Sequence, residues 1–161
     1  MLEHEGGLAM TLKVDEMYMR EAIKEGEQAL TSKDQPVGAV VVQHGRVIGR
    51  AHDQVKLLRD PTAHAVVIAL TQAASAVGSD QLPEAVAYVT KEPCSMCAGA
   101  LLLSGVSRLV FGAADSRTGA CGSVVDLTNN ERLNRRLVVV KDVLAGECHA
   151  LLRKAAPGVH S

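Results

Sequence analysis

Aromatic residues are scarce in this chain of 161 residues, which has one Phe, two Tyr and no Trp. The core must therefore rest on Val, Leu, Ile, Ala and Met, and the apolar content of 47% is enough for an ordinary globular core. The formal net charge of −1 leaves no basic field over the whole protein. This weakens a general nucleic-acid-coating role but still allows a local basic patch.

Targeting and membrane segments are also lacking. The N-terminus has no basic region followed by an apolar stretch, so no signal peptide is expected. No run approaches the ~18 apolar residues of a membrane span. Four cysteines without a secretory signal favour metal ligands or buried thiols over a disulfide framework. The sequence therefore predicts a cytoplasmic protein that makes no membrane contact.

The chain contains no repeat, low-complexity tract or linker that would divide it, and its length fits about one domain. We expect a flexible leader over residues 1–13, a single domain over residues 14–156 and a tail over residues 157–161. Hydrophobic periodicity and turn residues predict four helices and five strands. The helices are expected at 15–30, with Asp15 as N-cap, and at 63–77, 95–104 and 143–155. The strands are expected at 37–43, 47–51, 85–90, 108–112 and 137–141.

This order of elements predicts an α/β fold, a three-layer α/β/α sandwich around a central mixed five-stranded sheet. Several helices begin directly after strand ends. In such a fold the pocket lies at those ends, where the helix starts converge.

Two of these helix starts carry metal-ligand residues. Cys94-x-x-Cys97 lies at a strand-to-helix transition, and His64 lies at the start of the preceding helix. Helix N-termini favour thiolates, because unpaired N–H groups and the helix dipole stabilise negative charge. One His and two Cys make three protein ligands, the number found in catalytic zinc sites, whose fourth position holds water. The sequence thus predicts one Zn²⁺ held by His64, Cys94 and Cys97.

Two other interpretations of the cysteines remain open at this point. The C-x-x-C pair could be a redox dithiol, although thioredoxin-like chains offer no histidine helix of this kind. A structural zinc would require a fourth ligand, for which Cys121, Cys148 and His52 are the candidates.

The sequence blocks around these residues resemble a known family. His64-Ala65-Val66 followed by Pro93-Cys94-x-x-Cys97 is similar to the H-x-E…P-C-x-x-C signature of zinc-dependent nucleoside and nucleobase deaminases. Longer blocks resemble the bacterial tRNA-specific adenosine deaminases, which make inosine at the wobble position. They are PVGAVVV at 36–42, DPTAHA at 60–65, EPCSMCAGALL at 92–102 and RLVFGAADSRTGACGS at 108–123. The resemblance implies a cytidine-deaminase-like fold and a homodimer formed through the helix Met96–Leu103.

Position 66 departs from the family. The resemblance implies a glutamate there that carries protons between water, the ring nitrogen and the leaving ammonia, and valine cannot do so. General acid–base catalysis is worth ~10²–10⁴ in rate, so a strongly impaired enzyme is expected. The chain is then a pseudoenzyme, like the silent partner subunit of the eukaryotic heterodimeric tRNA deaminase, or an enzyme with an inactivating substitution. Alternatively, another carboxylate has taken over the proton transfer.

Asp53 is the candidate for that carboxylate. By the resemblance, its position usually holds an asparagine that contacts the target base, and ionised aspartate can only accept hydrogen bonds. A solvated residue at the strand end is the alternative interpretation. The resemblance also implies that Ala63 and Phe111 shape the pocket walls and that Asp115 contacts the anticodon-loop backbone. Glu92 is expected to be structural.

The sequence supports RNA binding less strongly than deaminase chemistry. Bacterial tRNA deaminases usually end in a basic helix, whereas only Arg153 and Lys154 are basic here, and Ala114 replaces a cationic residue of the family. A local basic patch could still form from Arg117, Arg132, Arg135 and Arg136. The substrate is therefore expected to be the tRNA anticodon loop or, alternatively, a small nucleobase or nucleoside such as guanine or cytosine. A silent zinc module that partners an active deaminase is the third hypothesis.

Overall fold

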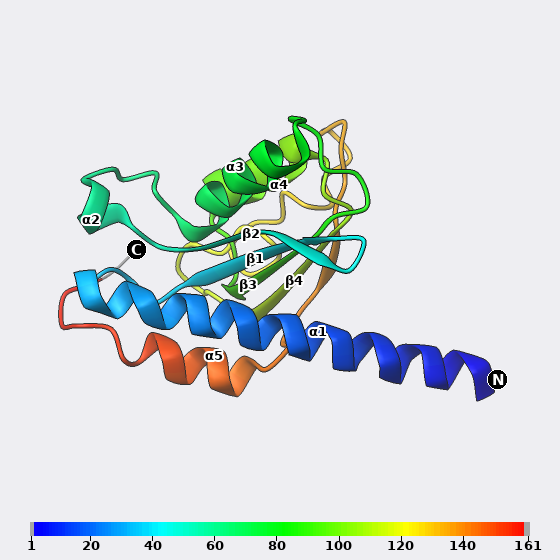
Figure 1. The fold of residues 1–161 in the computed structure, drawn as a ribbon, viewed down its shortest axis with the longest axis horizontal. Helices are drawn as coiled ribbons and strands as arrows, with labels where there is room; N and C mark the ends of the chain where they lie inside the picture. Colours follow the sequence, from blue (N-terminus) through cyan, green and yellow to red (C-terminus); the bar gives the residue numbers. More distant parts are fainter. Residues whose placement is uncertain (1, 160–161) are drawn as a thin grey trace.

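A mixed five-stranded sheet lies between two layers of helices in the computed structural model, which describes residues 2–159 (Figure 1). The strand order is β2-β1-β3-β4-β5, with β1 antiparallel to both neighbours and β3, β4 and β5 parallel. The strands are β1 (Gly38–Gln43), β2 (Arg46–His52), β3 (Val86–Lys91), β4 (Arg108–Ala113) and β5 (Val138–Val140). The helices are α1 (Leu2–Gln28), η1 (Ala29–Ser32), α2 (Val55–Leu58), α3 (Ala65–Val77), α4 (Ser95–Ser104) and α5 (Ala145–Leu152). The predicted three-layer fold is confirmed.

Both faces of the sheet are covered, which explains why its central strands are almost continuously apolar. Five of the six residues of β1 are buried, as are the last five of the six residues of β4. β1 and β2 form a hairpin whose two turn residues, His44 and Gly45, have φ of 49° and 72°. Positive φ at both positions matches the right-handed twist of the flanking strands.

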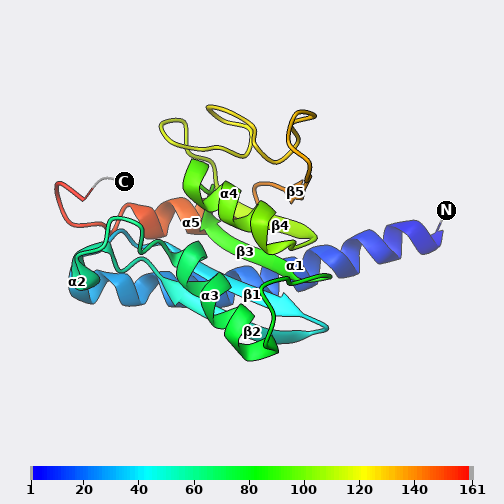
Figure 2. The same cartoon turned by 90° about the horizontal axis from the view of Figure 1, so that it is seen from above.

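The two helical layers bury separate apolar clusters. α3 and α4 lie side by side on one face and enclose the larger cluster, whereas α1 and α5 cover the other face (Figures 1 and 2). α1 approaches β1 closely at Gly38, where an added Cβ would lie 1.8 Å from the carbonyl oxygen of Ala22. Any side chain at Gly38 would therefore push the helix off the sheet.

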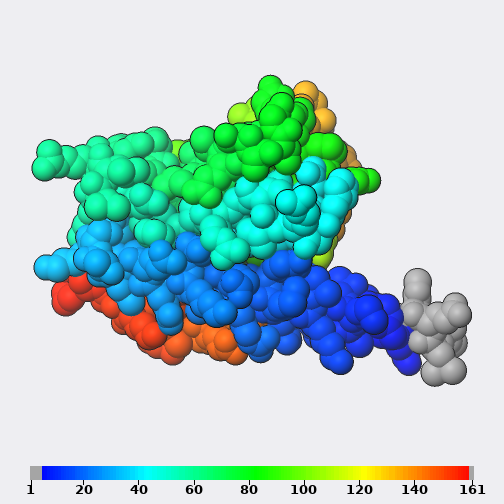
Figure 3. Space-filling view, viewed as in Figure 1, coloured from blue at the N-terminus to red at the C-terminus, as the bar shows by residue number. Residues whose placement is uncertain are grey.

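The start of α1 corrects the sequence prediction. Asp15 is not an N-cap, because the helix already begins at Leu2 and Asp15 is a buried residue within it. Residues 2–13, expected as a flexible leader, form the first part of this helix, which projects beyond the sheet (Figure 3). Leu, Glu, Ala, Met and Lys in this stretch are strong helix formers, which offsets the cost of Gly6 and Gly7.

Smaller differences occur elsewhere. The short helix α2 was not predicted, and α5 is shorter than the expected 143–155. Of the predicted tail, residues 160–161 lie outside the described residues. Among residues 2–159, no helix is long and apolar enough to cross a membrane.

The topology places two helix starts at one edge of the sheet. β2 and β3 are both antiparallel to β1, so they run in the same direction and their C-terminal ends lie at the same edge. α3 follows β2 after the 53–64 segment, and α4 follows β3. The N-termini of α3 and α4 therefore converge, as expected for a pocket in an α/β fold.

Candidate metal centre and base pocket

His64 is positioned by a tight turn. The Asp60 carboxylate accepts hydrogen bonds from the Thr62 N–H and hydroxyl, at 2.8 and 2.7 Å. The Ala63 N–H donates to the Asp60 carbonyl oxygen at 3.1 Å. His64 then takes the N-cap position of α3 with extended backbone, φ −77° and ψ 148°, and its side chain does not cap the helix. The imidazole is therefore directed away from its own helix and is only partly buried.

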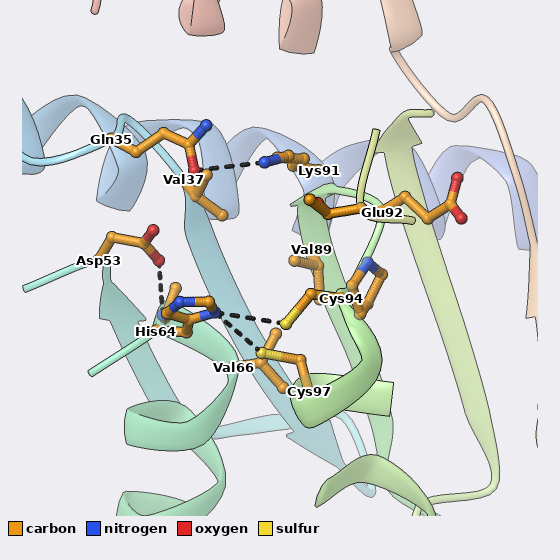
Figure 4. Close-up of a pocket in the computed structure, with 13 residues that line it drawn as sticks. Gln35, Val37, Asp53, His64, Val66, Val89, Lys91, Glu92, Cys94 and Cys97 are labelled. Atoms are coloured by element: carbon orange, nitrogen blue, oxygen red, sulfur yellow. Dashed lines mark hydrogen bonds between the residues drawn. The ribbon is translucent and has the colours of Figure 1, made fainter. Parts of the chain in front are cut away.

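The two cysteines face this imidazole from the start of α4. Cys94 is the N-cap, with φ −72° and ψ 178°, and Cys97 lies in the first turn. The proline before Cys94 fixes the chain in an extended conformation up to the helix start. His64 Nδ1 lies 3.6 Å from the Cys94 sulfur and 3.4 Å from the Cys97 sulfur (Figure 4). The three ligand atoms all lie within 4.8 Å of one another.

This donor set fits zinc. Tetrahedral zinc, at about 2.0–2.1 Å from nitrogen and about 2.3 Å from sulfur, requires nitrogen–sulfur separations of about 3.6 Å. The observed 3.6 and 3.4 Å agree with that requirement. A hydrogen bond from Cys97, together with His64, lowers the pKa of the Cys94 thiol to about 3. One ligand therefore already favours the thiolate form that binds metal.

Val66 lies beside this cluster. Its side chain is 4% exposed, belongs to the larger apolar core and lines a cavity of about 30 Å³ together with the three metal-ligand residues (Figure 4). Such a volume holds about one water molecule. The position at which the family signature has a carboxylate is thus an apolar wall.

Asp53 is buried at the other side of the same cavity. It is 5% exposed, which excludes a solvated strand-end residue. Its Oδ1 accepts a hydrogen bond of 2.7 Å from the Ala65 N–H, the first amide of α3. Burial raises the pKa of Asp53 to about 6, against the lowering effect of this hydrogen bond. One Asp53 oxygen therefore holds the start of the helix that carries His64.

The other predicted wall residues do not line this cavity. Ala63 is 3% exposed and immediately precedes His64, but it is not among the residues around the cavity. Phe111 is 1% exposed within β4 and packs in the core. The structure thus brings His64, Cys94 and Cys97 together with Asp53 and Val66, and leaves Ala63 and Phe111 behind the cavity wall.

Comparison with known proteins assigns this geometry to a family. The sequence model of the MafB19-like deaminases matches residues 14–147. The chain belongs to the MafB19-like deaminase family. It is 44% identical over 138 residues to a tRNA-specific adenosine deaminase of Bacillus subtilis (strain 168), covering 86% of each chain. It is 44% identical over 135 residues to that of Haemophilus influenzae, covering 83% of this chain and 78% of the relative.

Solved structures agree with this assignment. A structure from a study of A-to-I editing by tRNA:A34 deaminases superposes with a TM-score of 0.81 at 35% identity, covering 84% of this chain and 98% of that one. A guanine deaminase from Nitrosomonas europaea superposes with a TM-score of 0.74 at 26% identity, covering 87% and 83%. The chain therefore shares its fold with a tRNA:A34 deaminase and with a guanine deaminase.

Glu92 organises the loop that follows β4. Its carboxylate accepts hydrogen bonds from the N–H groups of Asp115, Cys121 and Ser123, at 3.1–3.2 Å, and from the Ser123 hydroxyl. A Cβ at Gly119 would lie 2.2 Å from Glu92 Oε2, so the carboxylate fits against bare backbone. These contacts agree with the structural role predicted from the sequence.

Asp115 is also engaged within the chain. Its carboxylate accepts hydrogen bonds from the Arg117 and Thr118 N–H groups and from the Thr118 hydroxyl. It also pairs with the Lys91 ammonium at 3.0 Å. The Asp115 side chain is only 10% exposed. Contact with an anticodon-loop backbone therefore stays a prediction, and these internal bonds would compete with it.

The alternative fourth ligands are not part of the cluster. Among the described residues, only His64, Cys94 and Cys97 group as ligands. The Cys121 sulfur lies 3.9 Å from the Pro93 carbonyl oxygen, and Cys148 belongs to the core on the opposite face of the sheet. His52 Nδ1 lies 3.8 Å from a Glu25 carboxylate oxygen. The residues present therefore form a three-ligand site, which suits a catalytic zinc.

Several pocket residues were not found from the sequence. Gln35, Lys91 and Thr118 line the cavity at the metal-ligand cluster. An adjoining pocket of about 260 Å³ shares Gln35, Asp53 and His64 and is bordered by Gly158 and Val159. Gln35 and Lys91 lie next to the family-like blocks PVG and EPC, which was the available signal.

The four arginines of the predicted basic patch, Arg117, Arg132, Arg135 and Arg136, are all exposed. Arg135 donates to Gln81 Oε1 and to the carbonyl oxygens of Leu102 and Leu103, at 2.8–3.1 Å, and so caps the C-terminus of α4. These bonds engage only Nη1 of Arg135, and a basic patch for phosphate contacts stays a prediction.

Proposed function

We propose that this chain is a zinc-binding member of the tRNA adenosine deaminase group whose turnover is strongly impaired by Val66. His64, Cys94 and Cys97 would hold one zinc ion. When bound, zinc would activate water for attack on the ring carbon that carries the exocyclic amine. The observation that carries the proposal is a complete ligand set beside an apolar residue at the acid–base position.

The cavity offers few carboxylates that could replace the glutamate of the family signature at position 66. Among the described residues that line the cavity, the carboxylates are Asp53 and Glu92. Both Glu92 oxygens accept hydrogen bonds from the 115–123 loop. Asp53 uses one oxygen to cap α3, so it is the remaining candidate for proton transfer and is constrained in that role.

We infer a base in tRNA as the substrate, because the relatives with 44% identity are tRNA-specific adenosine deaminases. Such a substrate implies a cytoplasmic protein. The similarity to a guanine deaminase and the outer pocket of about 260 Å³ beside Gly158 and Val159 support a free base as the alternative. Val66 supports the further alternative, a silent zinc module that partners an active deaminase.

We also propose a homodimer formed through α4. An added Cβ at Gly99 would meet no atom within 4 Å, and Leu103 is 72% exposed. The outer face of this helix is therefore small and apolar, which permits close approach of a second copy.

Restoring the carboxylate tests the proposed activity. We expect Val66→Glu to raise deamination by at least ~10²-fold, the usual size of acid–base catalysis. Val66→Gln is the matched control, because glutamine has the shape of glutamate but cannot carry the proton. We expect no gain in deamination from it. Ammonia or inosine release is measured with tRNA, adenosine, guanine and cytosine in parallel. Zinc content is determined for each variant, with one ion per chain expected.

Two results would contradict the proposal. Robust turnover by the chain as written that disappears in Asp53→Asn would identify Asp53 as the proton carrier. No gain from Val66→Glu on any substrate, with zinc bound, would identify a silent module instead of an impaired enzyme.

A further inference from the structure

The cavity has a polar wall opposite Val66. Lys91, at the end of β3, donates a hydrogen bond of 3.3 Å to Gln35 Oε1 (Figure 4). It also pairs with Asp115 Oδ2 at 3.0 Å. The Lys91 side chain is 11% exposed and that of Asp115 is 10% exposed. Asp115 is in turn fixed by Thr118 and by the Arg117 N–H. The ammonium group is thus held in place by a partly buried ion pair.

This ion pair fixes the orientation of the Gln35 amide. An amide group can present either its oxygen or its nitrogen to a ligand, depending on its hydrogen bonds. Here the oxygen is directed to Lys91, so the NH₂ group is the side left for other contacts. Within the described residues, the Gln35 side chain makes no hydrogen bond through its nitrogen.

Gln35 also lies where a ligand would pass. It lines both the cavity at the metal-ligand cluster and the adjoining outer pocket, together with Asp53 and His64. The Gln35 amide and the Asp53 carboxylate therefore border the same entrance. A flat heterocycle entering this space would pass both the Gln35 amide and the Asp53 carboxylate.

We propose that Gln35 is a substrate-contacting, specificity-determining residue and that Lys91 is the positioning residue that orients it. The Gln35 NH₂ group donates to a ring nitrogen or carbonyl oxygen on the edge of the bound base. The pocket then selects bases with an acceptor on that edge and disfavours those with a donor there. This inference rests on the proposed function in one respect, namely that the outer pocket of about 260 Å³ binds a nucleobase beside the metal-ligand cluster.

The test uses the low turnover of the chain as written, which permits equilibrium binding of intact bases. The zinc-loaded chain is titrated with adenine, guanine and cytosine. Gln35→Glu keeps the shape and the Lys91 contact but replaces the NH₂ donor with an acceptor. We expect it to weaken binding of the preferred base by about tenfold or more, the usual cost of an unmatched buried polar group. Gln35→Leu is a second variant that removes the amide altogether and should weaken binding similarly.

Lys91 is tested by its conservative variant. Lys91→Met should weaken base binding because the Gln35 amide is then free to flip, and Lys91→Arg should largely restore it. In the Val66→Glu background, Gln35→Glu should raise KM more than it lowers kcat. Zinc content should not change in any of these variants. If Lys91 had a purely structural role, its variants would instead change zinc content or stability. Lys91→Met and Lys91→Arg would then bind bases equally well.

The outcomes separate this contact from the proposed function. Unchanged base affinity in Gln35→Glu, or no binding of any of the three bases to the parent chain, overturns the contact. If Val66→Glu fails to deaminate while Gln35→Glu still weakens binding, the proposed activity fails and the contact stands. If Val66→Glu deaminates and Gln35→Glu changes neither affinity nor KM, the activity stands and the contact fails.

Discussion

The carboxylates of Glu92 and Asp115 hold one loop against the metal-ligand cluster from two sides. Glu92 accepts hydrogen bonds from the loop backbone, and Asp115 closes the turn at its start and pairs with Lys91. Both are acidic residues close to a cluster of metal ligands, yet their oxygens are used by the chain itself. Proximity to zinc ligands is therefore a poor guide to which carboxylate transfers protons.

The contacts of the Asp115 carboxylate should make the stability of the protein depend on pH. Burial alone would raise the pKa of Asp115, but hydrogen bonds from Thr118, the Arg117 N–H and Lys91 lower it from 3.8 to about 2. A lowered folded-state pKa stabilises the protein at pH values above 3.8, and this contribution is lost as the pH falls toward 2. We therefore expect Asp115→Asn to reduce the free energy of unfolding at pH 6, with a difference from the parent that shrinks below about pH 4.

The measurement is urea unfolding of both proteins in the presence of a chelator, so that zinc release at low pH does not contribute. A difference between parent and variant that stays constant from pH 6 to pH 3 would contradict this account.

Residues of the candidate metal centre were predictable from the sequence, whereas the polar wall was not. His64, Cys94 and Cys97 each lie at a helix start, and their spacing alone indicates a shared site. The contact between Gln35 and Lys91 joins residues 56 positions apart, from different elements. Its existence depends on side-chain orientation across the sheet edge, which periodicity does not specify.

At the level of elements, the predicted strands and the helices of the α3 and α4 layer agree with the structure because each is a strongly apolar segment between clear turn residues. The long α1 is the exception. Asp15 has the side chain of an N-cap, but it accepts hydrogen bonds from Tyr88 at 2.9 Å and from Arg108 at 2.7 and 2.9 Å. Local propensity could not reveal these partners, which are 73 and 93 residues away.

Asp15 should therefore be one of the strongest links between α1 and the sheet. We expect Asp15→Asn to lower the free energy of unfolding by about 2–4 kcal/mol, because it leaves the partly buried Arg108 without its counter-charge. Glu16→Gln makes the same charge change at the next residue of the helix. Its partner Arg20 is 4.0 Å away and 53% exposed, so we expect a change within about 0.5 kcal/mol. Chemical denaturation of zinc-loaded protein measures both, and equal effects would show that the Asp15 link is weak.

At the scale of the whole molecule, the exposed apolar residues include two helix surfaces that could form an interface. One is on the part of α1 that projects beyond the sheet, where Leu8 is 71% exposed (Figure 3). The other is on α4, where Leu103 is 72% exposed beside a groove of about 510 Å³ that also includes Leu70 of α3 and Arg135. The start of α4 carries Cys94 and Cys97. A second copy bound there would brace the candidate metal centre from outside.

A matched pair of leucines distinguishes the two surfaces. If the homodimer forms through α4, Leu103→Glu places a charge in its interface and should convert the protein to a monomer at micromolar concentration. Leu8→Glu makes the same change at an equally exposed position on α1 and should leave the dimer intact. Sedimentation velocity gives the mass of each species. Because both leucines are exposed, neither substitution should change the fold, which circular dichroism verifies. A monomeric parent chain would exclude the dimer, and dissociation by Leu8→Glu alone would move the interface to α1.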